Sequence, residues 1–259
     1  MAITQSFDPY TSQIISPAQL IDADKTLPQT MILTFQPRTF AVFLSEYDTT
    51  PLPGLYLEEE VESDSPARVG QARAFEYDGR TLAGCLAPVG APGTVALVEK
   101  AIAYGTRTFV VFGTCGALSP DIASGGLIVP SSAYRDEGTS YHYAHASDYI
   151  PIATAAKTAS LLTELGIAHT VGKVWTTDAF FRETQANMAR RVAEGCIAVD
   201  MEASALAAVA QFRSVAVHQF LYAADSLTDK EWDPRILGSL PAEPRAAYIR
   251  IAAELAVRL

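Results

Sequence analysis

Short apolar, β-rich runs alternate along the chain with longer alanine-rich runs whose apolar positions recur at helical spacing. This alternation is typical of α/β proteins, in which helices pack around a mainly parallel or mixed sheet. The pattern predicts strands over residues 31–35, 81–87, 108–112, 127–130, 169–175, 198–200 and 215–223. It predicts helices over residues 38–46, 94–104, 153–165, 184–194, 203–211 and 241–257. The pair Asp78-Gly79, between two short runs, predicts a β-hairpin.

Length and composition place the chain among globular proteins. At 259 residues it can bury one large core, and we predict a single domain over residues 1–259. Hydrophobic residues make up 49% of the chain and charged residues 19%, which argues against wholesale disorder. The net charge of -10 disfavours binding to nucleic acid or to an anionic membrane, because no excess of lysine and arginine exists to neutralise phosphates.

The cysteines are consistent with a reducing compartment, and the apolar stretches argue against a membrane span. Cys85, Cys115 and Cys196 are odd in number and lack C-x-x-C spacing, so neither a disulfide framework nor a metal site is predicted. The first residues do not resemble a secretion signal, and charged residues or glycines interrupt every apolar stretch before it reaches membrane-spanning length. We expect a cytoplasmic protein that does not bind membranes. The acidic segment over residues 47–67 is expected to be a solvated loop.

Two segments at the ends of predicted strands carry candidate chemistry. The strand over 108–112 runs into the small-residue turn Gly113-Thr114-Cys115-Gly116, where backbone N–H groups can approach an anion or a sugar and Thr114 is a candidate ligand contact. A plain strand-to-loop turn, with Cys115 as a packing residue, is the alternative. The polar run over residues 134–143 is expected either to line a site or to form a structural ion-pair cluster.

A third segment joins a predicted strand to a helix that Thr184 would cap. Here Phe180 or Phe181 is expected to stack on a planar heterocycle, and Arg182 or Glu183 to hydrogen-bond the edge of that ring. An aromatic core pair beside a capped helix is the alternative interpretation.

Carboxylate side chains lie at the ends of two further predicted strands. In an extended backbone Asp200 and Glu202 point to the same side, where they repel unless ligand hydroxyls or cations satisfy them, and Met201 between them can pack beneath a sugar. The alternative is an acidic helix start. Asp225 ends an apolar strand, so desolvation would raise its pKa and let it act as a general acid; turn capping is its alternative role.

In their residues and their order along the chain, these segments resemble the nucleoside phosphorylase family, which includes uridine phosphorylase and hexameric purine nucleoside phosphorylase. The resemblance extends from about Asp78 to the C-terminus, and the first seventy residues match poorly. It implies a three-layer αβα fold with a mixed, partly closed central sheet, and a homodimer or ring of dimers whose sites borrow residues from the neighbour. The matching residues lie at 112–117, 135–142, 177–180 and 200–202.

The resemblance also implies roles for single residues. Thr114, with the neighbouring Cys115 and Gly116, would lie near phosphate and ribose. Phe180 would lie against the base, and Met201 and Glu202 at the ribose. From their own segments we also predict Asp200 and Arg182 as substrate contacts. In purine-specific members an aspartate matching Asp225 protonates the purine at N7. Uridine-specific members hold the pyrimidine with a Gln and an Arg that the run Arg182-Glu183-Thr184 does not reproduce, which favours a purine.

The phosphate-binding pattern of the family is altered in this chain. The family's early Gly-Asp-Pro-x-Arg loop has no counterpart over residues 31–38, and Val111 stands where the phosphate-binding arginine is expected. Arg68 and Arg38 are candidate substitutes. No histidine precedes His142, so the N-terminal histidine that usually reaches a neighbour's 5′-hydroxyl is missing.

These observations favour a nucleoside phosphorylase, a pentosyltransferase of purine salvage that transfers the ribosyl group of a purine nucleoside to inorganic phosphate. No other cofactor is expected. The sequence leaves open a phosphate-independent nucleosidase, which Val111 favours, a uridine phosphorylase, and a non-catalytic nucleoside-binding protein.

Overall fold

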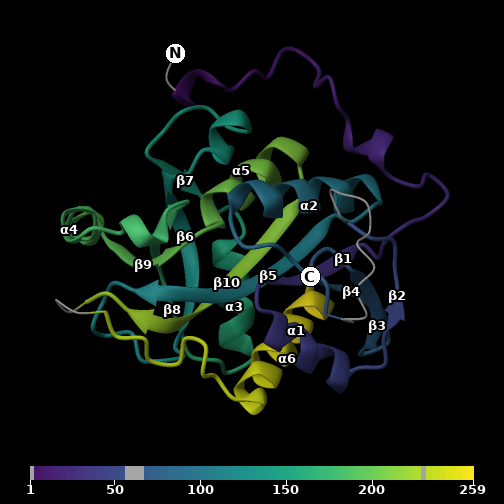
Figure 1. Cartoon of the computed structure of the whole chain (residues 1–259). Helices are drawn as coiled ribbons and strands as arrows, with labels where there is room; N and C mark the ends of the chain where they lie inside the picture. Colours follow the sequence, from purple (N-terminus) through teal and green to yellow (C-terminus); the bar gives the residue numbers. More distant parts are fainter. Residues whose placement is uncertain (1–2, 56–66, 229–231) are drawn as a thin grey trace.

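A mixed sheet forms the middle of the molecule (Figure 1). The computed structural model describes residues 3–55, 67–228 and 232–259. At the centre of the sheet, β1 (Thr30–Thr34) runs parallel to β5 (Thr108–Ala117) on one side and to β4 (Arg80–Leu86) on the other. The sheet continues through β3 (Ala72–Tyr77), which forms the predicted hairpin with β4, to the two-residue β2 (Thr50–Pro51).

Five strands close on themselves to form a small barrel. On one edge β5 pairs with β10 (Ala216–Ser226), and near its end the opposite edge pairs with β9 (Cys196–Asp200). From β9 the ladder passes to β8 (His169–Thr177) and then to β6 (Leu127–Asp136). An antiparallel pairing between β6 and β10 closes the ring. The predicted mixed, partly closed sheet is therefore confirmed.

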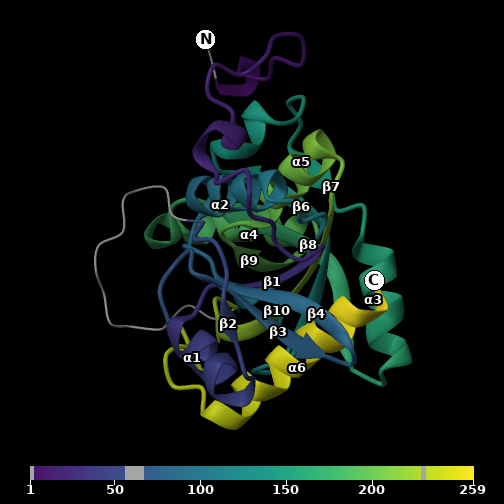
Figure 2. The same ribbon diagram turned by 90° about the vertical axis from the view of Figure 1, so that its right-hand side faces the viewer.

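Helices cover both faces of the sheet, which confirms the predicted three-layer fold (Figures 1 and 2). One face carries α2 (Ala91–Ala103) and α5 (Ala203–Arg213). The other carries α1 (Pro37–Glu46), α3 (Ala155–Glu164) and α6 (Ala242–Arg258). The short α4 (Gln185–Ala193) lies beside β9. Residues 203–209 of α5 are all buried, as expected for a helix without a polar stripe that is covered on every side.

The small-residue run after Phe112 is strand and not the turn that the sequence predicts. β5 continues to Ala117 because its backbone pairs with β10 throughout this stretch. Close packing requires the glycines: a Cβ on Gly113 would lie 2.7 Å from the ring of Phe35, and one on Gly116 would lie 2.5 Å from Leu227. The glycines therefore serve close packing of a strand rather than a sharp reversal.

The remaining differences between prediction and structure are local. The sequence misses β2 and β7 (Tyr149–Pro151), which are two and three residues long, and β6 extends six residues beyond its predicted end at Pro130. Most of the acidic segment over 47–67 lies outside the described residues, although Thr50 and Pro51 are paired in the sheet. Among the described helices, none is both long and apolar enough to cross a membrane. The assignment of residues 1–259 to one domain stays a prediction.

Candidate active site

A cavity of about 270 Å³ opens where β5 exchanges one neighbour for another. Along one edge, β5 pairs with β1 as far as Phe112, and with β9 only from Gly116 onward. The intervening edge of β5 has neither partner, so a ligand can reach it; open α/β sheets bind ligands at such crevices. The cavity is lined by Phe35, Gln36, Val89, Thr114, Cys115, Gly116, Phe180, Glu183, Val199, Asp200, Met201, Glu202, Asp225, Leu227 and Leu237.

Thr114 is oriented by a residue that the sequence analysis missed. The Gln36 amide Nε2 donates to Thr114 Oγ1 at 3.1 Å, while its Oε1 accepts from the Tyr222 hydroxyl at 3.4 Å. Gln36 lies two residues after the end of β1, and a polar residue close to a strand end is the signal that reveals it. Cys115 lies beside Thr114 but is buried, and burial raises the pKa of its thiol well above the usual value. It is therefore a packing residue rather than a thiolate nucleophile.

Asp200 holds the start of α5. Its Oδ1 accepts from Thr176 Oγ1 at 2.7 Å, and its Oδ2 accepts from the backbone N–H groups of Glu202 at 3.0 Å and Ala203 at 2.7 Å. Burial raises the pKa of Asp200, and these three donors oppose that rise. The helix-start interpretation thus describes Asp200, whose contacts fix the backbone that carries Glu202.

Glu202 is a buried carboxylate with one firm contact on a neighbouring loop. It is 6% exposed, and its Oε1 accepts from the backbone N–H of Gly90 at 2.6 Å. Gly90 adopts φ 98°, a left-handed conformation that favours glycine, at the start of α2. Burial, together with the nearby charge of Asp200, raises the pKa of Glu202. A positive ligand or a developing positive charge in the cavity would favour the ionised form.

Asp225 reaches the cavity because β10 contains a bulge. The register between β5 and β10 shifts after Ala223, so that Asp225 is opposite Gly116. Bulges of this kind re-aim a side chain relative to the rest of the strand. Burial raises the pKa of Asp225, whereas the hydrogen bond from Trp232 Nε1 to its Oδ2, 2.7 Å long, acts in the opposite direction.

The loop after β8 brings Phe180 and Glu183 to the cavity but leaves Arg182 outside it. Phe180 is 51% exposed, and Arg182 is exposed and absent from the lining. Burial first, and the charge of Asp225 second, raise the pKa of Glu183 to about 7. Of the two edge-binding candidates, only Glu183 therefore has the position to contact a ligand.

The candidate phosphate-binding arginines also lie outside the cavity. Arg38 donates from Nη1 to the Gly238 carbonyl at 2.9 Å, and Arg68 is not among the lining residues. Val111 is fully buried in the core formed with α2 and α5. Within the described part of the chain, the lining contains four carboxylates and no lysine or arginine.

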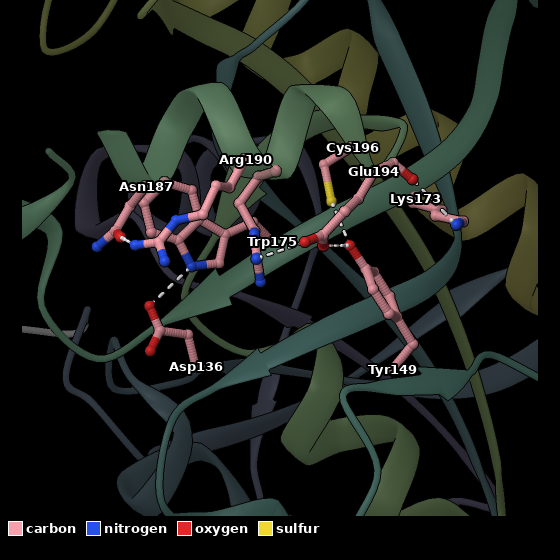
Figure 3. A network of polar contacts seen from close by, with 9 residues as sticks. Asp136, Tyr149, Lys173, Trp175, Asn187, Arg190, Glu194 and Cys196 are labelled. Atoms are coloured by element: carbon pink, nitrogen blue, oxygen red, sulfur yellow. Dashed lines mark hydrogen bonds and ion pairs between the residues drawn. The ribbon is translucent and has the colours of Figure 1, made fainter. Parts of the chain in front are cut away.

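The polar run over 134–143 forms structural networks. Arg135 is buried and donates from Nε to Ser140 Oγ at 2.8 Å, and Glu137 accepts from Ser204 Oγ on α5 at 2.9 Å. Asp136 accepts from Trp175 Nε1 at 2.9 Å, in a cluster beside α4 (Figure 3). These contacts support the structural alternative for this segment, because none of its residues lines the cavity.

The structure thus defines an α/β protein with a partly closed sheet and a carboxylate-lined cavity near its strand ends. Residues 32–253 match the phosphorylase superfamily, and the chain belongs to this family. Its overall fold matches that of purine nucleoside phosphorylase from Toxoplasma gondii in complex with immucillin-H, with a TM-score of 0.73, 19% identity and coverage of 96% of this chain and 98% of that one. The resemblance read from the motifs is confirmed at the level of the family.

Relatives named for different nucleosides are about equally similar to this chain in sequence. The chain is 32% identical to guanosine phosphorylase of Halorubrum lacusprofundi over 57% of this chain and 64% of that protein. It is 29% identical to DeoD-type purine nucleoside phosphorylase of Caldanaerobacter subterraneus subsp. tengcongensis, over 70% and 82% of the two chains. It is 31% identical to uridine phosphorylase of Salmonella typhimurium, over 46% and 49%. The matched region thus spans less than two thirds of the first and about half of the third.

Replacing Asp200 tests its role at the start of α5. Asp200→Ala leaves the two backbone N–H groups and the Thr176 hydroxyl without their acceptor, and buried donors left without partners cost about 1–3 kcal/mol. We expect a loss of unfolding free energy in this range by urea titration. Asp121→Ala, at an exposed position, is the matched control and should change stability by less than about 0.5 kcal/mol. Equal stability of the two variants would contradict the assignment.

Proposed function

We propose that the protein cleaves the N-glycosidic bond of a purine nucleoside with inorganic phosphate as the acceptor, giving the free base and ribose 1-phosphate. The observation that carries this proposal is the placement of Glu202 and Asp225 in one cavity, the first buried and the second at the bulge of β10. Membership of the phosphorylase superfamily supports the reaction class. No cofactor takes part in the proposed reaction.

The two carboxyl groups have different tasks in this reaction. As the bond between C1′ and the base nitrogen breaks, the ribose gains positive charge and the base gains negative charge. Ionised Glu202 would stabilise the sugar, and Asp225 in its acid form would transfer its proton to N7 of the departing base. A phosphate oxygen then forms the new bond to C1′. The hydroxyl of Thr114, which accepts from Gln36, would donate to this phosphate or to the sugar.

A purine is favoured over a pyrimidine by the groups at the base end. Asp225 is present, Phe180 lines the cavity, and Arg182 is exposed outside it. Two relatives reported above carry purine or guanosine in their names, and one carries uridine. We favour the first group because Asp225 would give a proton to N7, and among the described lining residues there is no lysine or arginine for a pyrimidine edge.

Hydrolysis is the second candidate, and one observation favours it. A phosphate dianion beside ionised Asp200 and Glu202 is repelled unless cations compensate, and the described lining has no lysine or arginine. Water needs no such compensation. Phosphorolysis is consistent with the cavity if a neighbouring subunit delivers the missing cation, so we propose a homo-oligomer in which sites are completed across an interface.

Base release with and without phosphate distinguishes the two candidates. We expect purified protein to release hypoxanthine from inosine, or adenine from adenosine, only when phosphate is added, with ribose 1-phosphate as the second product. Chromatography of base and sugar in phosphate-free and phosphate buffers measures this. Equal rates in both buffers, with ribose as the product, would replace phosphorolysis by hydrolysis. Absence of release in either buffer would contradict both.

Removing the proton donor should slow the release of purines. In Asp225→Asn the side chain cannot protonate N7, and loss of general acid catalysis typically costs about 10²–10⁴ in rate. We expect kcat for inosine to fall by this factor while the melting temperature stays close to that of the wild type. Asp233→Asn, at an exposed position on the loop after β10, is the control and should retain activity. Wild-type turnover by Asp225→Asn would remove Asp225 from the mechanism.

The pH dependence of kcat/KM should follow the ionisation of Glu183. Its pKa is raised to about 7 by burial and by Asp225, so it is neutral below that pH and ionised above it. Ionisation adds a negative charge beside the base, which itself becomes negative as it departs. We therefore expect kcat/KM to fall as the pH rises through about 7, and to fall less in Glu183→Gln, which cannot ionise. Superimposable pH profiles for the two proteins would contradict this role.

A further inference from the structure

The cavity continues outward into a second chamber. This outer chamber has a volume of about 400 Å³, against about 270 Å³ for the inner cavity. The two spaces adjoin, because five residues line both of them: Phe180, Glu183, Asp225, Leu227 and Leu237. The outer chamber alone is lined by Phe181, Gln185, Met188 and Trp232.

The walls of the outer chamber are largely apolar and aromatic although they face solvent. Phe181 is 87% exposed and Trp232 is 59% exposed, and both are large hydrophobic side chains. Single exposed hydrophobic residues are common, but a cluster around a cavity marks a binding surface. The ring of Phe181 lies against that of Phe180, with centroids 3.8 Å apart, so the aromatic surface of the inner cavity extends outward without a break.

The residues that line each space indicate which part of a bound nucleoside would face the outer chamber. Glu202 and Thr114 line only the inner cavity, whereas Glu183 and Asp225 line both spaces. If Glu202 contacts the ribose and Asp225 contacts N7 of the base, the outer chamber lies beyond the base. On a purine, the group beside N7 on the same edge of the ring is the exocyclic substituent on C6.

We propose that the outer chamber binds an apolar or aromatic substituent on the 6-amino group of a purine nucleoside, which makes N6-substituted adenosines substrates of this protein. The inference rests on the proposed function. In this arrangement N7 faces Asp225, the remaining N6–H donates to Glu183, and the substituent lies against Phe181, Met188 and Trp232. No new covalent step is involved, because only the leaving base differs.

Size and chemistry both fit such a group. An apolar cavity of about 150 Å³ is enough to bind benzene, so the outer chamber has room for a benzyl or branched alkenyl group. Burial of an aromatic ring between Phe181 and Trp232 removes apolar surface of ligand and protein from water. Glu183 is suited to the N6–H because none of the hydrogen bonds found among the described residues involves its carboxyl group.

Gln185→Trp is the variant that tests the outer chamber. Gln185 lines only this chamber, at the first turn of α4, and a tryptophan there would fill part of it. Ala186→Trp is the matched control, since Ala186 is exposed on the same helix and lines neither space. The substrates are adenosine and N6-benzyladenosine, with kcat/KM measured for each by base release.

We expect the wild type to cleave N6-benzyladenosine with a kcat/KM within about threefold of that for adenosine, or higher. In Gln185→Trp the value for N6-benzyladenosine should fall by about tenfold or more, a range typical of lost apolar contacts in a pocket, while that for adenosine stays within about twofold. Ala186→Trp should match the wild type on both. A wild-type preference for adenosine above about tenfold, or an equal loss on both substrates in Gln185→Trp, would overturn the proposal.

The other occupant to test is a second copy of this chain. If a neighbour covers Phe181 and Trp232, Gln185→Trp should change the molecular mass in light scattering and leave the substrate preference unchanged, an outcome that also overturns the proposal. Binding separates its failure from that of the proposed function. N6-benzyladenine should quench tryptophan fluorescence more strongly than adenine does, because the chain has 2 tryptophans and Trp175 is buried away from both spaces. This difference should vanish in Trp232→Phe, and it requires no catalysis.

Discussion

The exchange of strand partners along one edge of β5 is the constraint on which the site depends. The pairing of β5 with β1 ends at Phe112 and its pairing with β9 begins at Gly116, so a short length of the β5 edge stays open between the two partners. On its other edge, β5 is paired with β10 over its whole length. This continuous pairing keeps the open stretch extended and fixes the position of Thr114. The cavity is thus a gap in an otherwise paired sheet, bounded by rigid strands.

The same constraint explains how acidic groups come together in a largely apolar setting. Asp200 uses its oxygens on the start of α5, Glu202 is tied to Gly90, and Asp225 is tied to Trp232. Each carboxyl group is held by a donor from a different part of the chain. These contacts, made on folding, hold the carboxyl groups together in spite of their mutual repulsion. A ligand that brings positive charge or a proton acceptor relieves this repulsion and is therefore bound more favourably.

Much of this arrangement could be predicted from the sequence. The motifs at Thr114, Phe180, Glu202 and Asp225 were each assigned to a strand end, and the structure brings these four to one cavity. Such residues can be predicted because apolar runs locate strand ends. The parallel pairs β5 with β10 and β8 with β9 each end at one edge of the sheet. The antiparallel contact of β9 with β5, which brings the two pairs together, is not visible in the sequence.

The errors have physical causes that a linear pattern does not contain. The sequence predicts a turn after Phe112 because glycines are compatible with turns, whereas in the structure these glycines accommodate Phe35 and Leu227 from other segments. Glu183 rather than Arg182 faces the cavity because of the 3₁₀ turn at Phe180–Arg182, whose phase cannot be read from three residues. Gln36 was missed because its partner Thr114 is 78 residues away along the chain.

The charge of the cavity links the acceptor of the reaction to the assembly of the protein. Two unit charges about 6 Å apart repel by about 3 kcal/mol at an effective dielectric constant near 20, and a phosphate dianion would face more than one ionised carboxylate. Such a cost is too large for a phosphorylase to carry at each turnover without a compensating cation. The described residues of one chain place no lysine or arginine in the lining, and in the proposed homo-oligomer a neighbouring chain would supply the cation for phosphorolysis. Hydrolysis makes no such demand, because water carries no charge that needs a compensating cation. The nature of the acceptor and the need for an oligomer are therefore one physical question, decided by where the positive charge comes from.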